Sequence, residues 1–273
     1  MMIKDQATGI IYEKKESLST SANVVLLLVH GLGGHSGRWD ALSAFFAGRA
    51  CHSYAIDLRG FGRSEELPGD IDSFRTYYRD LLRLKQIIDE EHPGAKCFLV
   101  GESMGALLSF LLVCGHPQIC DGLICISPAF KSNLSLPLSL YARVFFALIF
   151  NPRKQFRIPF APDMFTRDKQ CLEGMQRDPR EHGLVSARLL WQVLLGQLKA
   201  AHCLQRMTKP AVFLLPEEDS IVSTRFSERI FRGLPSADKT MIRYPRMFHA
   251  LSIDLDKEKM FADVLQWIEK RRA

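Results

Sequence analysis

The feature that most constrains this chain is a serine held between two glycines where a predicted strand becomes a predicted helix. A short apolar run covers residues 97–100, Gly-Glu-Ser-Met-Gly follows at residues 101–105, and an apolar helical run covers residues 106–113. So tight a turn strains the serine backbone, and the flanking glycines let strand and helix pack closely. The pattern predicts that the Ser103 hydroxyl projects above the end of a sheet, as a nucleophile does.

Strands and helices alternate on both sides of this turn. Six consecutive aliphatic residues, 24–29, are typical of a strand buried on both faces of a parallel sheet. Further strands are predicted at residues 8–15, 52–56, 97–100, 122–126, 211–215 and 239–244. Helices are predicted at residues 38–49, 73–91, 106–113, 224–231 and 257–270. This order predicts an α/β fold with a mostly parallel, doubly wound sheet.

The alternation stops in the middle of the chain. Residues 129–209 hold three helix-like runs, at 134–150, 167–176 and 184–204, and no convincing strand. We therefore expect a core made of residues 1–128 and 210–273, with residues 129–209 inserted as a helical cap over the carboxyl ends of the strands. Thirteen Lys and Arg against five Asp and Glu give this segment a net charge of +8, while the chain as a whole carries +6.

The composition excludes several classes of protein. Hydrophobic residues make up 47% and charged residues 24% of the 273, an ordinary soluble profile. Residues 1–9 lack the apolar core of a signal peptide, and no apolar run is long enough to span a membrane. Seven cysteines without a Cys-x-x-Cys pair predict reduced thiols and a cytoplasmic protein. We expect no metal, cofactor or nucleic-acid partner, and nothing specifies an oligomeric state.

A serine hydroxyl becomes a good nucleophile only when a neighbouring base takes its proton, and an acid must orient that base. The strand at 211–215 runs into Glu217, Glu218 and Asp219, and the strand at 239–244 runs into His249. We favour His249 as the base and Asp219 as the acid, because a short side chain beyond the strand end suits the turn. The order Ser, Asp, His suits this arrangement of strands.

A glycine-rich loop, His-Gly-Leu-Gly-Gly-His-Ser-Gly-Arg-Trp at residues 30–39, follows the strand at 24–29. Such a loop can present backbone N–H groups to an anion, but it lacks the Gly-Lys-Ser/Thr ending of a nucleotide-binding loop. We expect the backbone N–H groups of Leu32 and Met104 to form an oxyanion hole. His30 is expected to shape the loop through hydrogen bonds.

Three segments resemble the α/β-hydrolase superfamily, and within it the monoacylglycerol lipase and lysophospholipase group. They are the loop at 30–39, Asp-Leu-Arg-Gly-Phe-Gly-Arg-Ser at 57–64 and Gly-Glu-Ser-Met-Gly-Ala at 101–106. The resemblance implies Ser103, Asp219 and His249 as a catalytic triad. This chain departs from the group at two positions. Gly34 stands where the group has a Glu that organises the loop together with the arginine matching Arg38, and Ala106 stands where the group has a second glycine.

The apolar run at residues 134–150 has three interpretations: a buried cap helix, the wall of an acyl-binding tunnel, or a patch that dips into a bilayer. Its basic neighbours Arg143, Arg153, Lys154 and Arg157 suit transient contact with an anionic lipid surface, although they also suit a solvated face. The residues expected to contact substrate are His30, Gly31, Arg38, Leu134, Leu138 and Phe145.

These observations predict a serine ester hydrolase that cleaves a lipid-like monoester, such as a monoacylglycerol or lysophospholipid, through an acyl-enzyme on Ser103. A small-ester carboxylesterase and an amide hydrolase similar to proline iminopeptidase are the alternatives. A dehalogenase or epoxide hydrolase would need an aspartate at position 103. A catalytically silent binding scaffold is the alternative outside enzymes.

Overall fold

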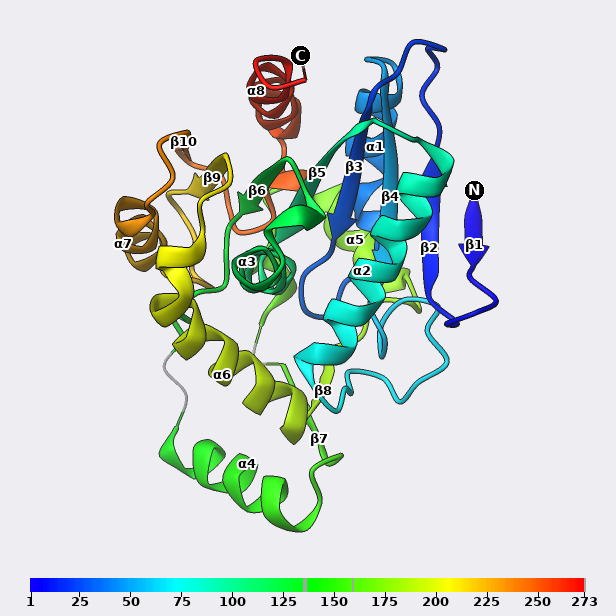
Figure 1. Cartoon of the computed structure of the whole chain (residues 1–273). Coiled ribbons are helices and arrows are strands. Elements are labelled where there is room, and N and C mark those ends of the chain that lie inside the picture. Colours follow the sequence, from blue (N-terminus) through cyan, green and yellow to red (C-terminus); the bar gives the residue numbers. More distant parts are fainter. Residues whose placement is uncertain (135–136, 159, 273) are drawn as a thin grey trace.

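The computed structural model describes residues 1–134, 137–158 and 160–272. At its centre is an eight-stranded sheet in the order β1-β2-β4-β3-β5-β6-β9-β10 (Figure 1). Its strands are β1 (Met2–Lys4), β2 (Ile11–Lys15), β3 (Val24–Val29), β4 (Cys51–Asp57), β5 (Lys96–Glu102), β6 (Gly122–Ile126), β9 (Ala211–Pro216) and β10 (Lys239–Tyr244). Strand β2 pairs antiparallel with β1 and β4, and the remaining pairs are parallel. The predicted α/β class with a mostly parallel sheet is confirmed.

Helices cover both faces of this sheet. Successive side chains of a strand point to opposite faces, and in the central strands both sets are apolar and are buried by helices. In β3, Val25 and Leu27 share a buried core with α2 (Phe74–Glu91) and α3 (Met104–Gly115). The alternate residues of β3 share a second core with α1 (Asp40–Ala47) and α8 (Lys257–Glu269). Helix α7 (Thr224–Gly233) lies beside β9 (Figure 1).

Between β6 and β9 the chain forms the helices α4 (Leu138–Phe150), α5 (Lys169–Arg177) and α6 (Ala187–Cys203). The expectation that this segment lacks strands is wrong, since β7 (Gln155–Arg157) pairs antiparallel with β8 (Leu184–Ser186). Strands of three residues are too short to show an alternating pattern in the sequence. Helix α4 begins later than the apolar run, because Pro137 is its N-cap residue. Ser135, Leu136 and Pro159, which fall within the expected cap, lie outside the described residues.

Helix α4 packs on the rest of the molecule by one face only. Its Ala147 is buried with Phe156 and with Ala187 of α6. Figure 1 shows α4 beneath α6, at the end of the molecule far from the N-terminus and the C-terminus. The opposite face leaves large apolar side chains exposed, namely Leu138, Tyr141, Phe145, Phe146, Ile149 and Phe150. The apolar run is therefore neither a fully buried helix nor a fully exposed one.

Candidate active site

Ser103 lies on the sharp turn between β5 and α3. Its backbone angles are φ 56° and ψ −117°, a left-handed region that costs free energy for any residue with a Cβ. A Cβ on Gly101 would lie 2.4 Å from the carbonyl oxygen of Gly105, and one on Gly105 would lie 2.1 Å from that of Val29. The two glycines of the motif are thus required by close packing of strand, turn and helix.

Asp219 and His249, which follow neighbouring strands, meet as a buried pair. His249 Nδ1 lies 2.8 Å from Asp219 Oδ2. The other carboxylate oxygen, Oδ1, accepts hydrogen bonds from the backbone N–H groups of Ile221 and Val222, each at 2.9 Å. With its carboxylate fixed in this way, Asp219 holds the imidazole proton on Nδ1 and leaves Nε2 free to accept one. Glu217 and Glu218, the rival acids, are exposed.

The carboxyl end of β6 connects the serine turn to the histidine loop. The N–H group of Ser103 donates to the carbonyl oxygen of Ile126 at 2.9 Å. The next residue, Ser127, donates its hydroxyl to the carbonyl oxygen of His249 at 2.6 Å. Adjacent residues of one strand end therefore position both the nucleophile candidate and the base candidate.

Sequence reasoning missed several residues that hold the site together. Asn133 donates its side-chain amide to the carbonyl oxygens of Asp219 (3.1 Å) and Val222 (2.8 Å), fixing the acid's turn. Buried Glu102 accepts hydrogen bonds from the hydroxyl (2.8 Å) and the N–H group (3.1 Å) of Ser252, just after His249. Burial raises the pKa of Glu102. The position of Glu102 inside the Gly-Glu-Ser-Met-Gly motif could have indicated a role in the site. Nothing in the sequence around Asn133 indicated one.

The glycine loop lies directly against Ser103. A Cβ on Gly31 would come within 3.1 Å of the Ser103 Cβ, so only glycine leaves room there without a shift of the turn. Leu32 is the next residue of the loop, and the N–H group of Met104 belongs to the first turn of α3, where amides have no acceptor within the helix. Both expected oxyanion donors thus come from segments that border the serine.

His30 is a structural part of this loop. Its Nδ1 lies 2.8 Å from the Gly31 carbonyl oxygen, and its Nε2 accepts the N–H group of Leu58 at 3.0 Å. Burial lowers the pKa of His30 to about 4, so the ring is neutral at pH 7. The expectation that His30 shapes the loop agrees with these bonds, whereas its inclusion among substrate contacts does not, because both ring nitrogens are occupied by backbone groups.

A pocket of about 150 Å³ lies beside the loop. Its lining includes Leu32, Arg38, Ile158, Phe160, Phe165 and Met175. The apolar residues expected to contact substrate are elsewhere: Leu138 and Phe145 are 83% and 58% exposed, and Leu134 is half-buried outside this lining. These three residues are not among those that line this pocket, because α4 turns its Leu138 and Phe145 toward solvent while Phe160 and Phe165 lie at the loop.

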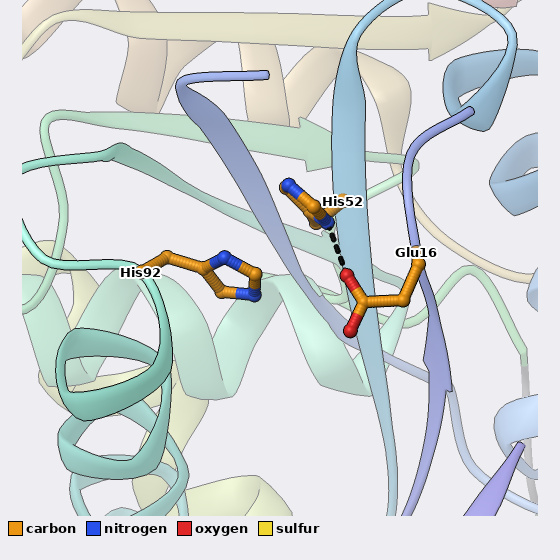
Figure 2. Close-up of side chains that lie close together, drawn as sticks. All are labelled: Glu16, His52 and His92. Carbon is orange, nitrogen blue, oxygen red and sulfur yellow. Dashed lines mark hydrogen bonds and ion pairs between the residues drawn. The ribbon is translucent and has the colours of Figure 1, made fainter. Parts of the chain in front are cut away.

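Among the described residues, one group of side chains has the donor types of a metal site, and it lies at the other end of the sheet. Figure 2 shows Glu16, His52 and His92, whose possible ligand atoms lie within 4.8 Å of one another. The centroids of the two imidazole rings lie 4.1 Å apart, and the ring planes are tilted by 33°. Lys14 pairs with Glu16, and His92 Nε2 lies 2.8 Å from the Tyr54 hydroxyl. These contacts are those of a hydrogen-bonded cluster.

Comparison with known proteins gives a consistent picture. A family model described as "Serine aminopeptidase, S33" (Hydrolase_4) matches residues 20–256. A monoglyceride lipase of Rattus norvegicus is 25% identical over 264 residues, covering 93% of this chain and 85% of that protein. A monoacylglycerol lipase of Mycolicibacterium smegmatis is 24% identical, covering 91% of this chain and 89% of that protein.

Two solved structures share the fold. A monoacylglycerol lipase of Paleococcus ferrophilus superposes with a TM-score of 0.86 at 24% identity, covering 96% of this chain and 99% of that one. A soluble variant of monoglyceride lipase from Saccharomyces cerevisiae, in complex with a substrate analogue, gives a TM-score of 0.87 at 21% identity. That superposition covers 100% of this chain and 95% of the yeast chain. At these identities the likeness concerns the fold alone.

Proposed function

The chain belongs to the serine aminopeptidase S33 family of α/β-hydrolases, and from this premise we infer that it is a carboxylic ester hydrolase acting through an acyl-enzyme on Ser103. The observation that carries the inference is the buried His249–Asp219 pair, joined through β6 to a serine held at φ 56°. A strained serine and an imidazole oriented by a carboxylate, both positioned by the end of β6, are the groups that nucleophilic catalysis requires.

In the proposed reaction, Ser103 Oγ attacks the ester carbonyl carbon while His249 Nε2 takes the hydroxyl proton. Asp219 keeps the Nδ1 proton in place and stabilises the imidazolium that forms. The N–H groups of Leu32 and Met104 donate to the developing oxyanion. His249 then gives its proton to the leaving alcohol, and the same imidazole activates the water that releases the acid from the acyl-enzyme.

The proposed substrate is a lipid-like monoester, with monoacylglycerol as the leading candidate. Several relatives that match most of the chain are named monoglyceride or monoacylglycerol lipases, and the pocket beside the loop has apolar walls at Ile158, Phe160 and Phe165. An aminopeptidase needs an acidic group to hold the substrate's amine. The carboxylate at this pocket, Glu181, is already paired with Arg38, which favours an ester over a peptide.

A chain-length series tests the substrate class. We expect hydrolysis of p-nitrophenyl esters, from acetyl to palmitoyl, to peak at about eight carbons or more, because each buried methylene contributes roughly 0.8 kcal/mol of binding. The measurement is kcat/KM for each ester, with 1-monoacylglycerols of matched length as second substrates. A peak at two to four carbons would contradict the lipid assignment and leave a small-ester carboxylesterase.

We also propose that the cap docks transiently on membrane surfaces through α4. Within the described residues, none of the helices combines the length and the apolar character that a membrane span needs. The exposed face of α4 carries Phe145, Phe146 and Phe150, and exposed Arg143, Lys154 and Arg157 lie within or just after the helix. An apolar face bordered by cations suits the interface of an anionic bilayer.

Vesicle binding checks this surface. We expect the chain to bind vesicles containing anionic lipid more tightly than neutral ones at low salt. A Phe145→Ser/Phe150→Ser variant should lose at least about tenfold in partitioning, since burying one Phe is worth roughly 1.5–3 kcal/mol. Leu18→Ser, which changes a residue 84% exposed in the N-terminal linker, is the matched control. Equal binding to neutral and anionic vesicles, or an unaffected double variant, would contradict the proposal.

A further inference from the structure

A short segment of the cap, residues 178–182 between α5 and β8, makes polar contacts with the glycine loop. Glu181 of this segment pairs with Arg38. The backbone N–H group of His182 donates to the carbonyl oxygen of Gly33 at 3.4 Å. His35 Nε2 lies 3.3 Å from Asp178 Oδ2. Three residues of this segment thus contact three residues of the loop that includes Leu32.

The pair between Arg38 and Glu181 has the geometry of a strong contact. Arg38 Nε and Nη2 each lie 2.6 Å from one oxygen of the Glu181 carboxylate. The two side chains are only 9% and 12% exposed, so water screens the charges weakly. The guanidinium also lies over the Phe165 ring at 5.3 Å, and that ring faces His249 edge-on at 6.0 Å. Arg38 is therefore held between the cap and the site.

The loop has no side chain of its own that could hold Arg38 from position 34. Gly34 lies under the arginine, and a Cβ built there would come within 2.9 Å of Arg38 Nε. A carboxylate on a side chain at this position would be near enough to pair with the guanidinium. In this chain the pairing carboxylate comes instead from Glu181, 143 residues along the chain.

The loop needs such an anchor because it is rich in glycine. Gly31 lies against Ser103, and Gly33 has φ +84°, so the backbone around Leu32 is intrinsically free to rotate. An oxyanion donor works only when its N–H group is already aimed at the developing charge, and small misplacements are costly in rate. An anchored Arg38 restrains this backbone from the carboxyl side, while His30 restrains it from the amino side.

We propose that Glu181 is a positioning residue that fixes the oxyanion loop through Arg38, so that the oxyanion hole is complete only while the cap segment 178–182 is docked. The inference rests on the proposed function and goes beyond it, because it makes cap docking a condition of efficient chemistry. The cap of this protein then both shapes the substrate pocket and assembles the site beneath it.

The test is steady-state hydrolysis of p-nitrophenyl butyrate by Glu181→Ala and Glu181→Gln. We expect Glu181→Ala to lower kcat by about 10- to 100-fold with KM changed less than about threefold, since the oxyanion donors act on the transition state. Glu181→Gln keeps one hydrogen bond but not the charge, and should fall between Glu181→Ala and the parent. Glu173→Ala, on the exposed face of α5, is the matched control and should leave both constants unchanged.

A second-site variant separates positioning from general stability. Gly34→Glu added to Glu181→Ala returns a carboxylate to Arg38 from the loop itself, and φ of Gly34 is not positive, so its backbone conformation accommodates a side chain. The neighbouring atom is the flexible end of Arg38, which can shift once Glu181 is gone. We expect the double variant to recover most of the lost kcat although the cap contact stays broken. A structural role of Glu181 in the cap would not be rescued from position 34.

The proposal is overturned if Glu181→Ala retains the parental kcat, if it changes KM alone, or if Gly34→Glu fails to restore kcat in a folded double variant. Failure of the proposed function looks different, because the parent itself would then neither hydrolyse esters nor react with a fluorophosphonate. In that case amide hydrogen exchange in residues 30–38 tests the anchor directly. Exchange should be faster in Glu181→Ala and slow again in the double variant, and unchanged exchange would overturn the anchor.

Discussion

Ser103→Ala is expected to lower kcat on the best ester of the chain-length series by about 10⁵- to 10⁶-fold and to abolish labelling by a fluorophosphonate. The hydroxyl is the only group removed, and without it neither the acyl-enzyme nor the proton transfer to His249 can occur. A residual acceleration over water remains, because the oxyanion donors and the binding pocket are intact. Alanine keeps the Cβ at φ 56°, so the backbone strain of the turn is the same in the variant as in the parent.

Ser109→Ala is the matched control for this experiment. Ser109 lies in α3, six residues after the nucleophile candidate, and its buried hydroxyl has no hydrogen-bond partner among the described residues. Its removal should cost little stability and leave kcat unchanged. Retention of ester hydrolysis or of fluorophosphonate labelling by Ser103→Ala would contradict the proposed nucleophile. An unreactive parent protein would favour the binding-scaffold alternative.

Asp219→Asn is expected to lower kcat by about 10³- to 10⁴-fold while leaving the fold intact. The substitution keeps one oxygen, which can still accept the N–H groups of Ile221 and Val222. The new NH₂ group then faces His249 Nδ1, which must become an acceptor, so the proton moves to Nε2. In that tautomer the imidazole can no longer take the proton of Ser103.

Three measurements together check this prediction. The midpoint of thermal unfolding should stay within a few degrees of the parent value, because the two backbone hydrogen bonds remain. Fluorophosphonate labelling should slow by a factor similar to the loss in kcat. Glu218→Gln, a neighbouring carboxylate that is exposed, should leave kcat unchanged. Near-parental activity of Asp219→Asn would show that another acid orients His249.

The sheet and the serine turn could be predicted because their signals are local. The strands β6 and β10 occupy the residues expected of them, and α2 starts after Ser73, whose hydroxyl accepts the N–H group of Arg75 at 3.2 Å. Buried aliphatic runs and an N-cap residue act over a few positions, so they can be recognised without knowing the rest of the fold. The short strands β7 and β8 could not be found in this way, because each is stabilised by pairing with the other, which is distant in the sequence.

The residues of the candidate site also divide into those with a local sequence signal and those that depend on tertiary contacts. Asp219 and His249 could be named because each follows a predicted strand, and carboxyl ends of parallel strands meet at one edge of a sheet. The contacts of Asn133 with the acid's turn and of Phe165 with the edge of His249 depend on how the segment after β6 folds back. The same holds for the lining of the pocket, which comes from Phe160 and Phe165 rather than from α4.

The sequence by itself determined the α/β fold class, the strained turn at Ser103 and the acid and base candidates, because each is encoded within a few neighbouring residues. Only the tertiary structure decided that Arg38 takes its carboxylate from Glu181, that α4 exposes one apolar face, and that His30 is fully engaged by backbone. Those outcomes depend on side chains that are distant in the chain and become neighbours only when the segment between β6 and β9 packs on the rest of the chain. Such pairings leave no periodic or local trace in a single sequence.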